Sequence, residues 1–247
     1  MALPVLNAPT YELTLTSSNE TIRYRPFLVK EEKILLMALE SNDEQEMMRS
    51  MKQIISSCVM SDIDVEKLPI FDIQYLFLSM RSVSVGEEIV LRFKHPDDLN
   101  SNKEECKHIQ DVKINLKQIK PTSLEGHTKK IDLSDSVGVV MKYPGLDMYN
   151  RFNKFDNDEE VNAIDAVFDI MIDNIEMIYQ DDSVFYTDDH TKEEMLDFLN
   201  SLNTKQFEDM RNFFQTMPYL RHEFDYVCDG CGCTEHVTLS GIEDFFA

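Results

Sequence analysis

Two cysteines near the end of the chain, Cys228 and Cys231, restrict the fold more than any other feature of the sequence. A Cys-x-x-Cys turn presents two thiolates to one metal ion, and Gly230 lets the backbone fold between them. A structural zinc site needs four ligands, so two more must come from elsewhere in the chain. We therefore expect a segment distant in sequence to lie against this turn.

A second group of metal-binding residue types lies far upstream, around Cys106. The predicted ligands of a structural zinc ion are Cys228, Cys231, Cys106 and His95, with His108 as the alternate to His95 and with Cys233 and His236 nearby. A zinc-free loop of reduced cysteines is the open alternative. A redox role is disfavoured, because Cys-x-x-Cys catalysis normally opens a helix after a strand.

Both cysteine groups are flanked by segments that alternate apolar and polar residues, as β-strands do. Residues 84–94 and 112–116 flank the first group, and residues 224–228 and 237–239 flank the second. If the two thiol-bearing loops converge, segments 84–120 and 224–246 form one paired β unit. Two such loops are how a four-ligand zinc ribbon is assembled from distant sequence.

The remaining patterns predict an α+β chain. We expect a β-hairpin over residues 11–25, followed by helices over 30–40, 47–58 and 72–80. The section 145–223 has helical periodicity, including one long amphipathic helix over 161–175 and a capping box at Thr191 and Glu194. We expect residues 1–247 to form one intertwined domain, composed of a hairpin with helices (1–83), the paired β unit (84–120 with 224–246) and the helical section (145–223).

The charge balance limits the partners. The chain has 24 Lys and Arg against 46 Asp and Glu, a net charge of −22. Nucleic acids and anionic membranes need basic patches that displace counterions, so we expect neither as a partner. Apolar residues make up 43% of the chain, which allows a packed core, and no apolar run reaches the ~18 residues of a membrane span. No secretion signal is evident, and an odd number of five cysteines indicates reduced thiols.

Catalytic motifs are missing from the sequence. It contains no GxSxG, HExxH, P-loop or GxGxxG pattern, so we predict no catalytic or cofactor-binding residues and expect a protein that is not an enzyme. The aspartate pairs at 181–182 and 188–189 lack the central glycine and terminal glutamate of a calcium loop. They predict a solvated acidic loop.

The C-terminal residues Ile242, Phe245 and Phe246 fall on one face of a single helical turn. A turn this short is unstable alone, so it must pack against another surface. That surface is either the protein's own core or a partner. We predict Phe245 and Phe246 as candidate partner contacts.

Several segments resemble the baseplate hub proteins of T-even-type contractile-tailed phages. They are the opening Met-Ala-Leu-Pro with residues 9–13, the segments Tyr24–Lys33 and Met80–Glu87, and the ending from Cys228 to Phe246. The resemblance spans essentially the whole chain and is least specific over residues 120–190.

The resemblance implies a structural or assembly role in the central hub of the tail baseplate, with other hub proteins as partners and no catalysis. It implies a location in the host cytoplasm during assembly and in the tail baseplate of the virion. The alternatives are a metal-dependent enzyme of unknown class and a structural-zinc adaptor with a cellular partner.

Overall fold

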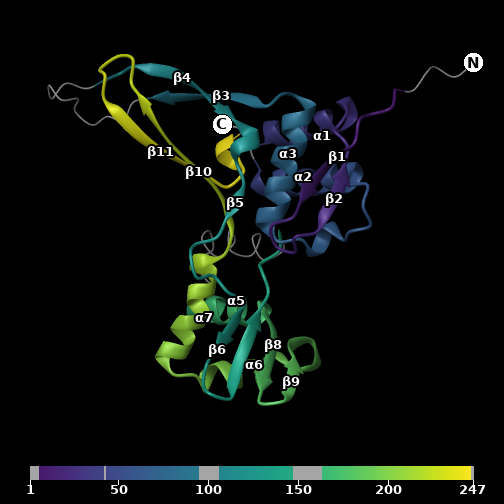
Figure 1. The fold of residues 1–247 in the computed structure, drawn as a ribbon, viewed down its shortest axis with the longest axis vertical. Coiled ribbons are helices and arrows are strands. Elements are labelled where there is room, and N and C mark those ends of the chain that lie inside the picture. The colour runs from purple at the N-terminus through teal and green to yellow at the C-terminus, as the bar shows by residue number, and fades with distance from the viewer. Residues whose placement is uncertain (1–5, 42, 95–105, 147–162, 246–247) are drawn as a thin grey trace, which may run out of the picture. The chain divides into compact units, whose positions relative to one another are not determined.

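The computed structural model of the chain describes residues 6–41, 43–94, 106–146 and 163–245 (Figure 1). The chain divides into two compact units: unit 1 comprises residues 1–65, 71–122 and 219–247, and unit 2 comprises residues 66–70 and 123–218. Helices and small antiparallel sheets occur together, so the predicted α+β class is confirmed. The prediction that residues 1–247 form one intertwined domain stays a prediction.

Unit 1 combines helices with β-hairpins. Its main elements are β1 (Tyr11–Thr14), β2 (Thr21–Tyr24), α1 (Val29–Ser41), α2 (Glu44–Cys58), α3 (Ile70–Ser84, of which Ile70 belongs to unit 2), β3 (Glu88–Lys94), β4 (Ile109–Asn115), β5 (Pro121–Thr122), β10 (Tyr219–Val227) and β11 (Thr234–Ser240). The predicted N-terminal hairpin and the three predicted helices are therefore present, with bounds that differ by a few residues.

Helix α3 lies at the centre of the unit 1 core. Its buried apolar side chains are Phe71, Ile73, Leu76, Phe77, Leu78 and Met80. They point in almost every direction around the helix, and a helix that is apolar all round is stable only when other elements cover it. The hairpin β1–β2 and helices α1 and α2 contribute further buried residues to unit 1, including Ile22, Leu35 and Ile55.

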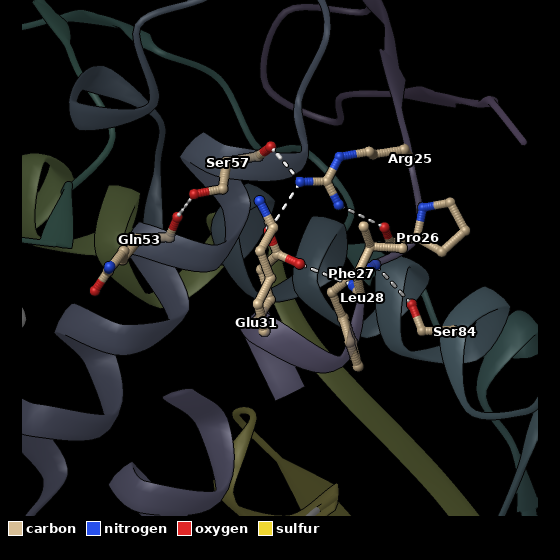
Figure 2. Close-up of polar contacts among 9 residues, drawn as sticks. Arg25, Pro26, Phe27, Leu28, Glu31, Gln53, Ser57 and Ser84 are labelled. Atoms are coloured by element: carbon tan, nitrogen blue, oxygen red, sulfur yellow. Dashed lines mark hydrogen bonds and ion pairs between the residues drawn. The ribbon is translucent and has the colours of Figure 1, made fainter. Parts of the chain in front are cut away.

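An ion pair with a buried carboxylate joins the end of β2 to α1 and α2 in unit 1 (Figure 2). The guanidinium of Arg25, just after β2, donates from Nη2 to Oε1 of Glu31 in α1 at 2.9 Å. It also donates to the carbonyl oxygens of Ser57 in α2 and Pro26, both at 2.9 Å. Glu31 is only 1% exposed, and its second oxygen accepts from the backbone N–H of Leu28 at 2.8 Å. The Glu31 carboxylate therefore caps the N-terminus of α1 and also binds the Arg25 guanidinium.

The adjacent backbone is tied to α3. The N–H of Phe27 donates to Oγ of Ser84 at 3.0 Å, and that hydroxyl donates to the carbonyl of Met80 at 2.6 Å. We call Arg25, Glu31 and these contacts the Arg25 network. It brings together the two segments, Tyr24–Lys33 and Met80–Glu87, on which much of the family resemblance depends.

A second buried carboxylate, Asp72, has backbone partners. Its two oxygens accept from the N–H groups of Thr16 and Ser17, at 2.8 and 3.2 Å, which attaches the β1–β2 turn to the first turn of α3. Burial raises the pKa of Asp72, because these hydrogen bonds only partly replace water. Burial acts in the same direction on Glu31, but the hydrogen bonds from Arg25 and Leu28 outweigh it and lower the pKa of Glu31.

Two antiparallel hairpins complete unit 1. Strand β3 pairs with β4 from Glu88↔Asn115 to Lys94↔Ile109, and β10 pairs with β11 from Arg221↔Ser240 to Val227↔Thr234. The hairpins meet through aromatic rings: the centroid of Phe93 lies 5.9 Å from that of Phe224 and 5.6 Å from that of Tyr226. This contact brings together segments separated by more than one hundred residues.

Unit 2 is a four-stranded sheet with helices. Its elements are β6 (Lys130–Asp132), β7 (Val137–Met141), α5 (Ala163–Asp173), β8 (Ile175–Gln180), β9 (Ser183–Tyr186), α6 (Lys192–Asn200) and α7 (Thr204–Thr216). The strand order is β6-β7-β8-β9, and every pair is antiparallel. The core joins sheet residues such as Val139 and Met141 to Met171 of α5, Met195 of α6 and Phe213 of α7. The predicted capping box of Thr191 and Glu194 is confirmed at the start of α6.

The prediction of a helical section over 145–223 is wrong for residues 175–186, which form the hairpin β8–β9, and for residues 219–223, which begin β10. The predicted long helix ends at Asp173, and Ile175 begins the hairpin β8–β9. Asn174 ends the helix, because its side-chain amide donates back to the carbonyl of Ile170 at 2.7 Å. Asp181 then takes a positive φ of 49° in the two-residue turn between the strands. Among the described residues, no helix is both long and apolar enough to cross a membrane.

Candidate metal centre

Three thiols from two distant segments meet in unit 1. The sulfur atoms of Cys106, Cys228 and Cys231 all lie within 4.8 Å of one another. The Sγ atoms of Cys106 and Cys228 are 3.7 Å apart. A disulfide requires ~2.05 Å, whereas two thiolates bound at ~2.3 Å to a tetrahedral ion stand ~3.8 Å apart. The spacing fits two ligands of a single ion as well as a hydrogen bond between two thiols, so the three thiols could hold a metal.

Backbone hydrogen bonds shape the turn that carries Cys228 and Cys231. The N–H of Cys228 donates to the carbonyl of Cys233 at 2.8 Å, and the N–H of Gly232 donates to the carbonyl of Cys228 at 2.7 Å. Gly232 has a φ of +73°, which residues other than glycine rarely adopt. The turn is thus fixed by its own backbone and by the hairpin β10–β11 on either side of it.

One side chain of β4 positions this turn against the upstream segment. The amide of Gln110 donates to the carbonyl of Val227 at 3.1 Å and accepts from the N–H of Asp229 at 2.8 Å. Both bonds run from the strand that follows Cys106 to the residues beside Cys228. We did not predict Gln110, because an isolated glutamine in a strand has no pattern that marks it as a cross-link.

The thiols lie at the edge of an apolar cluster. Cys228 is 1% exposed and Cys106 is 8% exposed, and the cluster also contains Phe93, Val112, Phe224, Tyr226 and Val237. Burial opposes ionisation of Cys228, but hydrogen bonds from the backbone N–H groups of Cys231 and Gly230 lower its thiol pKa. A backbone hydrogen bond from Cys233 acts to lower the pKa of Cys231, whereas burial and the neighbouring thiols raise it to about 12. Of these two thiols, Cys228 therefore ionises more readily than Cys231.

The other predicted ligands are placed differently. His95 lies outside the described residues. His108 packs directly on the turn, since a Cβ added to Gly230 would stand 2.5 Å from the Cβ of His108 and 3.3 Å from its Nδ1. His236 instead pairs with Asp225 on the hairpin surface, at 2.7 Å. Of the described His, Cys and carboxylate side chains, the three cysteines form the group whose donor atoms converge.

The C-terminal turn packs inside unit 1. Ile242 and Phe245 are each 1% exposed, and the N–H of Phe245 donates to the carbonyl of Ile242 at 3.1 Å. The ring of Phe245 is therefore part of the core and is not available at the surface of the isolated chain. Phe246 lies outside the described residues, and its role as a partner contact stays a prediction.

Comparison with known families identifies the chain. Residues 8–247 match the family model described as the T4 bacteriophage base plate protein. The chain belongs to this base plate family. The searches of curated proteins and of solved structures found no match. The family confirms the resemblance to T4-type phage baseplate proteins, and it is a family of structural components of the phage tail.

A partly buried histidine of this base plate family member has hydrogen-bond partners on both ring nitrogens. His127 of unit 2 lies between the Thr216 hydroxyl, 2.9 Å from Nδ1, and the Tyr143 hydroxyl, 3.0 Å from Nε2. Burial, with a smaller contribution from Lys129, lowers the pKa of His127. Its ring also stacks on that of Tyr143 and packs at a tilt against that of Phe213. Packing within unit 2 therefore explains the lowered pKa of His127.

Proposed function

We propose that the chain is a non-enzymatic structural or assembly component of the baseplate hub, acting through contacts with other hub proteins. The observation that carries this proposal is the family match over residues 8–247. The net charge of −22 supports protein partners over nucleic acid, because a nucleic-acid surface requires basic residues that release counterions. The protein would act in the host cytoplasm during assembly and in the tail baseplate of the virion.

Three of the described groups with shifted pKa values have hydrogen-bond partners inside the fold, which supports a structural role for them. Glu31 and Asp72 bind backbone N–H groups, and His127 joins two hydroxyl groups within unit 2. An active site usually shows such shifted groups in an open cleft, where substrate reaches them. Here each of the three groups is hydrogen-bonded within the protein itself.

We further propose that the three-cysteine group binds zinc and that a histidine, His95 or the alternate His108, supplies the fourth ligand; the ring nitrogens of His108 do not converge with the three sulfur atoms, so His108 would have to turn toward them. Zinc prefers thiolate and imidazole ligands in tetrahedral geometry, and the Cys106–Cys228 spacing fits that geometry. His108 is the described candidate that touches the turn, through Gly230. Cys106 and Cys228 are buried, whereas a catalytic zinc keeps an open position for substrate, so a structural ion fits better than a metal-dependent enzyme.

Co-expression with the hub proteins of the same phage tests the hub assignment. The expected result is a stable complex that survives size-exclusion chromatography at physiological salt. As a control, the proteins of the baseplate periphery are co-expressed with the chain in the same way. Recovery of the chain as a monomer from every combination would overturn the proposal, and a complex with peripheral proteins alone would overturn the hub assignment.

A further inference from the structure

The two edges of the unit 2 sheet differ in how they meet solvent. At one edge, the short strand β6 carries the exposed charged residues Lys130 and Asp132. At the other edge, strand β9 has the sequence Ser-Val-Phe-Tyr, and all four of its residues are exposed. Proteins usually protect edge strands with charges, proline or bulges, because unpaired N–H and C=O groups recruit other strands. The β6 edge has this protection and β9 has none of it.

The apolar side chains of β9 are solvent-exposed on both faces of the strand. Val184 is 49% exposed, Phe185 40% and Tyr186 52%. Successive side chains of a strand point to opposite faces, so Phe185 lies on one face and its two neighbours lie on the other. No described strand pairs with the outer edge of β9. The pairing Gln180↔Ser183 closes the two-residue turn, so the N–H and C=O of Val184 point toward that open edge.

A cleft lies beside Phe185. It has a volume of about 390 Å³ and is lined by residues of β7, β8, β9 and α6, among them Ile178, Phe185, Met195 and Phe198. His190 and Glu194 form its polar side. A strand added to β9 would direct alternate side chains toward this cleft, which is how strand-addition sites obtain specificity.

Acidic residues flank β9 at both ends. Asp181 and Asp182 form the turn before it, Asp188 and Asp189 follow it, and all four are exposed. Between residues 175 and 204 the chain has eight carboxylates and one lysine, Lys192, which pairs with Asp169 at 2.6 Å. A partner on this edge must therefore be basic at its flanks. A second copy of β9 in antiparallel pairing would place one aspartate pair against the other, so the charge argues against self-association.

We propose that the outer edge of β9 binds an extended, basic segment of another protein by strand addition. The segment has apolar residues at alternate positions and Lys or Arg at its ends. Its backbone pairs with the outer edge of β9, an apolar side chain enters the cleft beside Phe185, and its flanking cations contact the two aspartate pairs. The identity of that protein as a baseplate component rests on the proposed function, whereas the binding chemistry does not.

A synthetic peptide tests the chemistry directly. The probe is fluorescently labelled Lys-Lys-Val-Thr-Val-Thr-Val-Lys-Lys, and the control replaces each Lys by Glu. Fluorescence anisotropy with the full chain should show saturable binding of the basic peptide, weakened at high salt, and at least tenfold weaker binding of the acidic one. Equal binding of both peptides, or of neither, would overturn the proposal.

Two variants locate the site. Val184→Pro removes an N–H at the open edge, and we expect a loss of affinity of at least tenfold. The double variant Asp188→Asn, Asp189→Asn should weaken binding several-fold and reduce its dependence on salt. The matched control Glu125→Gln, Asp209→Asn removes the same number of exposed charges outside this segment and should leave the affinity unchanged. Thermal melting of each variant confirms that it is folded.

If Val184→Pro is unfolded, Phe185→Glu is measured in its place, because its side chain lies beside the cleft and is partly exposed. Unchanged peptide affinity in folded edge variants would overturn the proposal. Sedimentation that shows a wild-type dimer abolished by Val184→Pro would also overturn it, in favour of a second copy on this edge.

The same edge variant separates this inference from the proposed function. If the hub complex forms equally well with Val184→Pro and with the wild-type chain, the hub assignment stands and the role of β9 as its docking edge falls. If the basic peptide binds at β9 but no hub protein forms a complex with the wild-type chain, the binding chemistry stands and the hub assignment falls.

Discussion

The Arg25 network and the three-cysteine group both connect distant segments of the chain, but they do so with different chemistry. Both lie in unit 1, and both join segments that are far apart in sequence. In the network, each charge of Arg25 and Glu31 finds its partners within the chain, and no buried side-chain N or O atom among the described residues lacks a hydrogen bond. The cysteine group gathers three sulfur donors around a point where an ion fits. In the first junction each charge has its partners within the chain, whereas the second has three sulfur donors that could hold a metal ion.

The largest expected effect concerns the network. Arg25→Met leaves the buried Glu31 carboxylate with the exposed Lys30, 3.3 Å from Oε1, as its remaining cation. Because Lys30 is largely in solvent and replaces none of the hydrogen bonds of Arg25, we expect a loss of ~3 kcal/mol in the free energy of unfolding. The double variant Arg25→Met, Glu31→Met removes both charges and should recover much of this loss, because it leaves no buried charge unpaired. Urea denaturation of the three chains checks both expectations. A single variant as stable as the double variant would show that the carboxylate does not depend on Arg25.

The next effect concerns the metal. At a free zinc concentration of about one hundred times the Kd, binding to the folded state alone should raise the free energy of unfolding by ~2.7 kcal/mol. Cys106→Ser should abolish this increment, because it removes one of three gathered sulfur ligands. Cys58→Ala is the control: Cys58 is a buried thiol of α2 outside the group, so the zinc increment should persist. Urea denaturation with zinc and with chelator measures both increments, and a zinc-insensitive wild-type chain would leave the cysteines as reduced thiols.

A smaller effect tests how His108 contacts the turn. Gly230→Ala places a methyl group 2.5 Å from the Cβ of His108, and we expect a loss of ~1–3 kcal/mol from overpacking. Adding His108→Gly should relieve the clash. If His108 is a zinc ligand, the double variant recovers apo stability without recovering zinc affinity, as isothermal titration would show. Recovery of full zinc affinity would assign the fourth ligand elsewhere.

The smallest effect is a difference in pH dependence between the two buried carboxylates. The pKa of Glu31 is lowered from 4.5, so its stabilising contribution is present above that value and is lost as the pH falls through the lower folded value. The pKa of Asp72 is raised from 3.8, so its contribution is fully present below that value and is lost as the pH rises through the folded value.

Glu31→Gln and Asp72→Asn measure these two contributions. Compared with the wild-type chain between about pH 3 and pH 7, the stability difference should shrink toward acid for Glu31→Gln and shrink toward neutral pH for Asp72→Asn. If the stability difference changed with pH in the same direction for both variants, Arg25 would not be the cause of opposite pKa shifts at Glu31 and Asp72.

The two regions also differ in how far sequence could predict them. The Cys-x-x-Cys turn and an isolated upstream cysteine have a chemical signature, so Cys106, Cys228 and Cys231 were predicted together. Arg25 and Glu31 belong to different elements, and charged residues are too common for their spacing to indicate a pair. Gln110 had no signature either, because an isolated glutamine in a strand has no pattern that marks it as a cross-link. The capping box of α6 was predictable because its hydrogen bonds are local, at Thr191 and Glu194.

The hairpin β8–β9 shows a different limit. The apolar residues from 161 to 175 keep helical spacing, and Ile175 fits either a helix or a strand. The change of structure depends on Asn174, which ends the helix by a hydrogen bond to its own last turn, and on the tight turn at Asp181. The four aspartates favoured a solvated loop, and the exposed strand between them was missed because Ser-Val-Phe-Tyr is too short to show alternation.

The most direct test of the central claim is electron microscopy of phage assembled without this chain. A nonsense mutation early in its coding sequence, in the phage that encodes it, is grown with and without the wild-type chain supplied from a plasmid. Our account predicts that the uncomplemented lysate lacks complete baseplates and tails, and that complementation restores them. Complete baseplates in the uncomplemented lysate would contradict the claim that the chain is a structural or assembly component of the hub.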